Sequence, residues 1–333
     1  MNYAQTIAEL KRSDEILFTS HVKPDGDGLS SIAALRRWLE SLGKTVDLVL
    51  PAAPPGRYQF LLPEGPVKVV GRNVTVEQIH IPGLLCIVDT GTWQQLAGLE
   101  KLVESCRGRV MVIDHHLTQD DLADFSLVDP KAAAAVIVVK QLLAEAGFPL
   151  DAETASILLA GLATDTDWFR LPNVDAEVFR HAAELTAAGA VPWEVHERLF
   201  LGDDLAKVRL LGFALAGLKS ALGGRAMVMR LTREIFRKIG TDAADTENLI
   251  NESMKVRGTL AAAMLVETDS DDVRVSLRSR PGIDVGRIAE RFGGGGHVRA
   301  SGLRMRGSLD EVEGRVLAAL DEAMTEAAKR ARA

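Results

Sequence analysis

The stretch EILFTSHVKPDGDG (15–28) decides how the N-terminal part of this chain should fold. Its first six residues form a short apolar run typical of a buried strand, and a polar cluster follows at once. LLCIVDTG (84–91) and RVMVIDHH (109–116) repeat this arrangement of a strand that ends in polar residues. Helical patterns alternate with the strands, over residues 29–42, 136–146 and 154–162. Such alternation predicts an α/β domain with a doubly wound, mostly parallel sheet.

The C-terminal part carries a different pattern. Three runs are predicted strands: RAMVMRLT (225–232), GTLAAAMLVET (258–268) and DVRVSLRS (272–279). Helical patterns over 284–292 and 308–331 accompany them, which predicts a smaller α+β domain. We therefore expect three parts in the chain: a first domain over 1–190, a helical linker over 191–224 and a second domain over 225–333.

Composition narrows the classes of function. The 333 residues carry a net charge of −7, with a pI near 5.6. Proteins that grip long nucleic acids usually have a basic excess, so we expect short nucleic acids and no long duplex as partners. No apolar run is long enough to span a membrane and no signal-peptide core is present, so we expect a cytoplasmic protein without a membrane partner. Cys86 and Cys106 give no disulfide framework.

Four separated polar clusters carry the candidate chemistry. The carboxyl ends of parallel strands meet at one edge of a sheet, so the clusters that follow three of the strands should converge there. The fourth cluster, a single acid after a helical pattern, could reach the same edge. Carboxylates and imidazoles without thiolates favour a pair of manganese ions, with magnesium or zinc as alternatives. The clusters comprise His21, Asp25 and Asp27; Asp89; Asp114, His115 and His116; and Asp165.

Each cluster also has a plainer interpretation. Asp-Gly-Asp-Gly (25–28) is commonly a surface turn, and many strands end in aspartate. Three adjacent titratable groups after a buried strand are costly unless paired or metal-bound, so the triplet 114–116 favours a metal site. We interpret Gly26 and Gly28 as residues that let the loop around Asp27 fold tightly. The histidines outside the clusters are expected to be ordinary surface or packing residues: His80, His181 and His196.

The motifs also resemble a known family. HVKPDGDGLSS (21–31), VDT (88–90), VIDHH (112–116) and GLATDTDWF (161–169) resemble, in this order, the four motifs of the DHH phosphoesterase superfamily. FGGGGHVRASG (292–302), preceded by VSLRS (275–279), resembles the companion DHHA1 substrate domain. The layout is most similar to the branch of bifunctional oligoribonucleases (nanoRNases) that also dephosphorylate 3′-phosphoadenosine 5′-phosphate (pAp).

The resemblance implies roles for the clusters. One ion would be bound by His21, Asp25 and Asp89. The second would be bound by Asp27, Asp89, His115 and Asp165, so that Asp89 bridges the two. His116 would contact the scissile phosphate or donate a proton, and Asp114 would orient a histidine, as metal-site imidazoles generally require.

The resemblance also implies a substrate site in the second domain. Arg278 would hold a phosphate, because a guanidinium fork matches phosphate oxygens, although it could also be a solvated strand-edge arginine. The run 293–296 alone could be a flexible loop, but its glycines would let backbone approach a ligand beside His297. The expected substrate residues are Arg278, His297, Gly294, Gly295, Gly296, Arg257 and Arg299.

The expected activity is hydrolysis of short oligoribonucleotides to mononucleotides, with pAp as a further substrate. A phosphodiesterase for cyclic or linear dinucleotides needs the same metal site and stays an alternative. A pyrophosphatase or polyphosphatase fits less well because its substrate has no base, and a sensor without catalysis fits less well because every ligand position is filled. A homodimer is a further possible partner arrangement. The chain departs from the family pattern at 92–94, 132–135, Asp167 and Trp168, and these departures bear on substrate preference.

Overall fold

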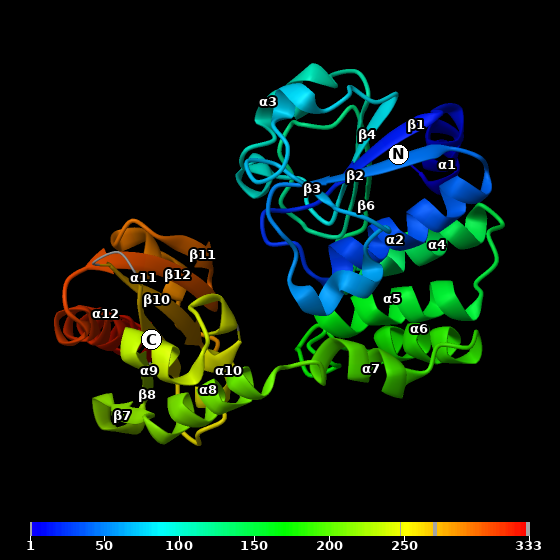
Figure 1. The fold of residues 1–333 in the computed structure, drawn as a ribbon. Helices are drawn as coiled ribbons and strands as arrows, with labels where there is room; N and C mark the ends of the chain where they lie inside the picture. Colours follow the sequence, from blue (N-terminus) through cyan, green and yellow to red (C-terminus); the bar gives the residue numbers. More distant parts are fainter. Residues whose placement is uncertain (1, 247, 269–271, 331–333) are drawn as a thin grey trace. The chain divides into compact units, whose positions relative to one another are not determined.

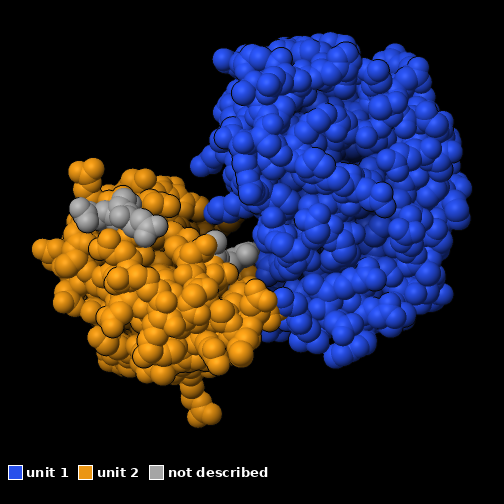
Figure 2. Space-filling view, viewed as in Figure 1, with its two compact units in different colours: residues 1–202 blue, residues 203–333 orange. Residues whose placement is uncertain are grey.

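The computed structural model describes residues 2–246, 248–268 and 272–330, and the chain divides into two compact units (Figure 2). Unit 1 comprises residues 1–202 and unit 2 comprises residues 203–333. The stretch 191–224 is shared between them: α7 (Pro192–Phe200) belongs to unit 1 and α8 (Leu205–Ala216) to unit 2. None of the helices in the described ranges is long and apolar enough to cross a membrane.

Unit 1 is built on a six-stranded parallel sheet with the order β3-β2-β1-β4-β5-β6 (Figure 1). The chain fills the sheet outward from β1 on one side and from β4 on the other, so the switch point of a doubly wound sheet lies between them. This confirms the predicted fold class. The strands are β1 (Glu15–Thr19), β2 (Thr45–Leu50), β3 (Lys68–Val69), β4 (Leu84–Val88), β5 (Val110–Asp114) and β6 (Phe125–Val128).

Apolar residues of this sheet alternate between two cores. On β1, Phe18 packs in the core that contains α2, α4 and α5, whereas Leu17 packs in the core that contains α3. Because both faces are covered, β4 and β5 are buried throughout, as their unbroken apolar sequences predict. The helices are α1 (Tyr3–Arg12), α2 (Gly26–Ser41), α3 (Glu100–Ser105), α4 (Ala135–Glu145), α5 (Ala152–Asp165) and α6 (Ala176–Ala187), with short 3₁₀ turns at 56–61, 76–78 and 93–96.

The first motif is helical where the sequence was interpreted as a tight loop, and that interpretation is wrong. Gly26 and Gly28 lie in the first turn of α2. A Cβ atom at Gly26 would lie 2.4 Å from Oγ1 of Thr164, and one at Gly28 would lie 2.4 Å from Oγ of Ser20. Glycine is therefore needed because α2 packs closely against α5 and the end of β1, not because the backbone turns sharply.

Unit 2 contains a second six-stranded sheet, with the order β11-β12-β10-β9-β8-β7. Its strands pair antiparallel except β8 and β9, which are parallel. The strands are β7 (Lys219–Ala221), β8 (Ala226–Leu231), β9 (Ala261–Glu267), β10 (Asp272–Ser279), β11 (Gly295–His297) and β12 (Ala300–Arg306). The glycine run is therefore not a free loop, because its end pairs with β12.

The two faces of the second sheet are covered differently. Val275 and Leu277 of β10 pack in a core with α11 (Val285–Arg291) and α12 (Leu309–Arg330). On the other face α8, α9 (Arg233–Ile239) and α10 (Leu249–Ser253) form a core with β8 and β9. Gly302 and Arg304 of β12 are exposed. Part of this second face, over β10, β12 and β11, therefore carries exposed and polar residues.

Candidate metal centre

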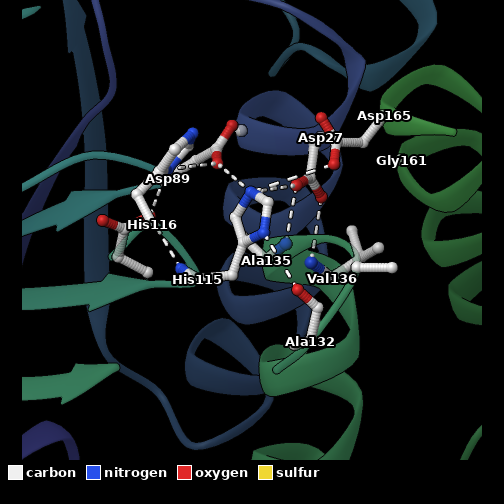
Figure 3. Close-up of polar contacts among 12 residues, drawn as sticks. Asp27, Asp89, His115, His116, Ala132, Ala135, Val136, Gly161 and Asp165 are labelled. Carbon is white, nitrogen blue, oxygen red and sulfur yellow. Dashed lines mark hydrogen bonds and ion pairs between the residues drawn. The ribbon is translucent and has the colours of Figure 1, made fainter. Parts of the chain in front are cut away.

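The polar clusters of the first unit meet at the carboxyl ends of β1, β4 and β5 (Figure 3). His21 follows β1, Asp89 follows β4, and His115 follows β5. Asp25 is the N-cap of α2, and its Oδ1 accepts hydrogen bonds from the backbone N–H of Asp27 and Gly28 at 3.0 and 3.2 Å. Asp165 is the last residue of α5. The site lies at the switch point, where open parallel sheets place their ligands.

Two sets of side chains share Asp89. Nε2 of His21 lies 3.6 Å from Oδ1 of Asp25 and 3.5 Å from Oδ2 of Asp89. The other oxygen of Asp89 lies 3.4 Å from Nε2 of His115. That same nitrogen is 3.8 Å from Oδ2 of Asp27 and 3.9 Å from Oδ2 of Asp165. Asp89 thus turns one oxygen toward each set.

Two buried atoms of this cluster have no hydrogen-bond partner: Oδ1 of Asp89 and Nε2 of His115. Nδ1 of His115 lies 3.2 Å from the carbonyl of Ala132, to which it can only donate, so Nε2 is the nitrogen that faces the carboxylates and that could bind a cation once it loses its proton. Ligands at about 2.0–2.2 Å from one cation lie about 3–3.5 Å apart, close to the separations here. Unpaired buried acceptors and donor atoms of these kinds fit divalent cations.

Asp27 is fully buried and joins the site to a helix. Its Oδ2 accepts from the backbone N–H of Ala135 at 2.6 Å, and its Oδ1 accepts from that of Val136 at 2.9 Å. The N-cap of α4, Ala134, supplies no side-chain cap, so Asp27 takes that role from α2. Burial and the charges of Asp89 and Asp165 raise the pKa of Asp27. The two amides and the positive end of α4 favour the ionised form in return.

The electrostatics of the cluster follow from burial and opposed charges. Burial alone lowers the pKa of both ligand-like histidines, but the neighbouring carboxylates outweigh it and raise the pKa of His21 and of His115 to about 10. Burial disfavours the charged form of Asp165 as well, which for a carboxyl group raises the pKa, here to about 7. Burial opposes ionisation of Asp89, yet the nearby imidazoles of His115 and His21 lower its pKa to about 2. Protons therefore occupy the imidazoles where cations would bind.

His116 is held by a different set of contacts. Its Nδ1 lies 2.8 Å from Oδ1 of Asp114, and this hydrogen bond raises the pKa of His116. Asp114 is fully buried, and its Oδ2 accepts from Nε2 of Gln119 at 2.6 Å. The His116 side chain is 51% exposed, so it can meet a substrate. Asp114 thus holds the Nδ1 side of the His116 ring and leaves the rest of the ring exposed.

Gln119 was missed in the sequence, because one polar residue after the third motif gives no signal. Its Nε2 also donates to the carbonyl of His116 at 3.0 Å. The backbone of Gly91 passes so close that a Cβ there would lie 1.7 Å from Oε1 of Gln119. Gln119 is therefore packed between the second and third motifs. Its hydrogen bonds hold the side chain of Asp114 and the backbone of His116 in place.

The departures at 132–135 and at Trp168 have structural explanations. The alanines of the first segment act through their backbone, since the carbonyl of Ala132 and the N–H of Ala135 make the contacts described above. Trp168 packs edge-on against His196 and Phe200, with ring centroids 4.9 and 5.8 Å apart. His196 is thus a packing residue, as expected.

Comparison with known proteins adds independent evidence. Residues 15–162 match the DHH family, N-terminal domain, and residues 223–326 match the DHHA1 domain. This chain belongs to the DHH family. Its activity class is that of a metal-dependent hydrolytic phosphoesterase.

Two curated relatives extend over nearly the whole chain. The bifunctional oligoribonuclease and PAP phosphatase NrnA of Thermus thermophilus is 33% identical over 324 residues, which cover 96% of this chain and 94% of that protein. The protein of the same name from Bacillus subtilis is 27% identical over 320 residues, covering 95% and 97%. A crystal structure of an exopolyphosphatase-related protein from Bacteroides fragilis matches with a TM-score of 0.90 at 24% identity, covering 98% and 97%, which shows a shared DHH fold.

The DHHA1 domain places two expected substrate residues in one row across its sheet. Arg278 on β10 is opposite Ala300 on β12, which is opposite His297 on β11, so these residues share a face. Arg278 is half-buried and its Nε donates to Oδ1 of Asn251 at 3.0 Å. Asn251, on α10, is a further residue that sequence reasoning missed. Burial lowers the pKa of Arg278.

The glycines of this DHHA1 motif serve two different ends. A Cβ at Gly294 would lie 2.3 Å from the carbonyl oxygen of Gly302, and one at Gly296 would lie 2.6 Å from Cα of Ser301. Packing against β12 therefore requires glycine at these two positions. Gly295 differs, because a Cβ there would meet nothing within 4 Å. Arg257 lies in an exposed turn after α10, and Arg299 is exposed between β11 and β12.

Proposed function

We propose that this chain hydrolyses short oligoribonucleotides to mononucleotides and removes the 3′-phosphate of pAp, with two divalent cations bound in the DHH domain. The observation that carries the proposal is the position of Asp89, whose two carboxylate oxygens face two different sets of candidate ligands. Its Oδ1 and the Nε2 of His115 that it faces are both buried without a hydrogen-bond partner. The printed activities of the two curated relatives support this choice of substrates.

The first cation would be held by His21, Asp25 and Asp89. The second would be held by Asp27, Asp89, His115 and Asp165. Imidazole and carboxylate donors without thiolates favour manganese over metals that prefer soft sulfur ligands. Magnesium and zinc also accept such donors. When bound, such a pair of cations makes water more acidic and neutralises charge on a phosphate.

The chain's own residues would then act as follows. Asp114 holds the Nδ1–H of His116, so that Nε2 can donate a proton to the leaving oxygen or contact the phosphate. In the DHHA1 domain, Arg278 would bind a substrate phosphate through its guanidinium, and His297 in the same row would contact the base. Gly295 leaves room beside them for the sugar and base to approach the backbone.

A panel of substrates with Mn²⁺ tests the proposal. It comprises 5′-phosphorylated di- to decanucleotides, pAp, cyclic and linear dinucleotides, and pyrophosphate. We expect turnover of short oligonucleotides and pAp, and none after chelation. Preference for cyclic dinucleotides over all others would favour the dinucleotide phosphodiesterase, and cleavage of pyrophosphate alone would reject the proposal.

A further inference from the structure

Two arginines lie directly opposite each other on the exposed face of the DHHA1 sheet. Arg274 on β10 pairs in register with Arg304 on β12. Residues 274 and 278 are an even number of positions apart on one strand, so this pair shares a face with Arg278. Like charges directly opposite each other destabilise a sheet unless an anion neutralises them. The pair therefore needs an explanation.

The protein neutralises this pair only in part. Arg274 is half-buried, and its Nη2 donates to the carbonyl of Ala243 at 2.7 Å and to the hydroxyl of Thr246. Its Nε is buried without a hydrogen-bond partner. Burial and the charge of Arg304 lower the pKa of Arg274, and the charge of Asp242 offsets this only in part. Arg304 is exposed, and within residues 2–246, 248–268 and 272–330 no hydrogen bond or ion pair reaches it.

The neighbouring arginine on the same strand shows the contrast. Arg306 is opposite Asp272, and its Nε lies 3.9 Å from Oδ1 of that carboxylate. Its side chain is 94% exposed. Arg306 thus lies across from a negatively charged residue, whereas Arg304 lies across from a positively charged one. The cationic part of the face ends at Arg304.

Between the two cationic rows, β11 and β12 carry only glycine on this face, whereas β10 carries Ser276 and is contacted by α10. Ser276 is opposite Gly302, which is opposite Gly295, so this row separates the Arg278 row from the Arg274–Arg304 row. Arg274 and Arg278 are four positions apart on β10, so the two rows lie about 13 Å apart at 3.3 Å per residue. One phosphate group cannot touch both rows, but successive phosphates of a chain laid along the glycines of β11 and β12 can.

We propose that Arg304, together with Arg274, forms a second phosphate subsite that binds the oligonucleotide chain beyond the phosphate held by Arg278. The inference rests on the proposed function, because it concerns the same substrate. pAp ends at its own nucleoside and does not extend to this subsite. Arg304 therefore discriminates between oligonucleotides and pAp and favours substrates longer than a dinucleotide.

Binding to the full chain, stripped of metal by a chelator, tests the subsite without turnover. The probe is 5′-phosphorylated pentaadenylate with a 3′ fluorophore, followed by fluorescence anisotropy, with unlabelled pAp as competitor. Arg304→Gln should weaken pentanucleotide binding about tenfold, equivalent to about 1.4 kcal/mol, and leave the pAp inhibition constant unchanged. The slope of log affinity against log salt should fall by about 0.7, as expected for one lost contact with a single strand.

Arg306→Gln is the matched control, since it removes an exposed arginine of the same strand that is already opposite an acid. It should leave pentanucleotide affinity unchanged. Equal weakening by both substitutions, equal loss of pentanucleotide and pAp binding in Arg304→Gln, or no pentanucleotide binding by the unaltered chain would each overturn the subsite. Arg304-dependent binding in a chain that cleaves no oligonucleotide with Mn²⁺ would support the subsite and reject the proposed function.

Discussion

Oδ1 of Asp27 accepts a hydrogen bond from the backbone N–H of Val136 at 2.9 Å, although 109 positions separate the two residues in the sequence. The same carboxylate accepts from Ala135 and faces the unpartnered Nε2 of His115 (Figure 3). One buried side chain thus caps α4 and contributes to the candidate metal site. Stability and metal binding should therefore change together when this residue is altered.

Asp27→Asn should lower both properties. The amide keeps one acceptor but turns an NH₂ group toward a backbone N–H, so we expect the free energy of unfolding to fall by about 1–3 kcal/mol. Mn²⁺ binding should fall from two ions to one, measured by calorimetry alongside denaturant unfolding. Asp175→Asn is the control, because Oδ1 of Asp175 accepts from two successive N–H groups of α6 far from the cluster in sequence. Two bound ions and unchanged stability in Asp27→Asn would contradict the coupling.

Asp89 tests the bridging arrangement. Its φ of 64° is left-handed, a conformation that asparagine tolerates better than alanine does, so Asp89→Asn removes the charge with little backbone cost. We expect it to lose both ions and all turnover, whereas Asp165→Asn should lose one ion. Manganese stoichiometry by titration distinguishes the two variants. Retention of one tightly bound ion in Asp89→Asn would show that the ions do not share this carboxylate.

Gln119 should control His116 without touching the metals. Gln119→Leu removes the donor to Asp114, so we expect kcat to fall about 10–100-fold with two Mn²⁺ still bound. Loss of a firmly held Asp114 should also lower the pKa of His116 and move the alkaline limb of the kcat–pH profile to lower pH.

Gly91→Ala should reproduce the effects of Gln119→Leu, because the new Cβ would displace Oε1 of Gln119. Gly56→Ala is the matched control, since a Cβ there meets nothing within 4 Å. The idea fails if Gly91→Ala keeps normal kcat while Gln119→Leu does not.

Metal removal should reveal the protons held by His21 and His115. Their folded pKa values of about 10 exceed the ordinary value of 6.5, so the stability they add is complete below pH 6.5 and is lost as pH rises through 10. The chelated protein should therefore lose thermal stability between pH 7 and 10. Mn²⁺ must displace these protons, so its affinity should rise up to about tenfold per pH unit for each proton released. Mn²⁺ affinity that is independent of pH would contradict this.

The α/β class follows from local sequence patterns, because buried strands and helices differ in the period of their apolar residues. The sequence also indicates which side chains could bind metal, since the order of a parallel sheet brings strand ends together. Only the tertiary structure decided how those atoms are used. The cap of Asp27 on α4, the wedge of Gln119 against Gly91, and the opposed Arg274 and Arg304 all join residues far apart in the chain. Such contacts depend on packing distance and strand register, which no local pattern of residues records.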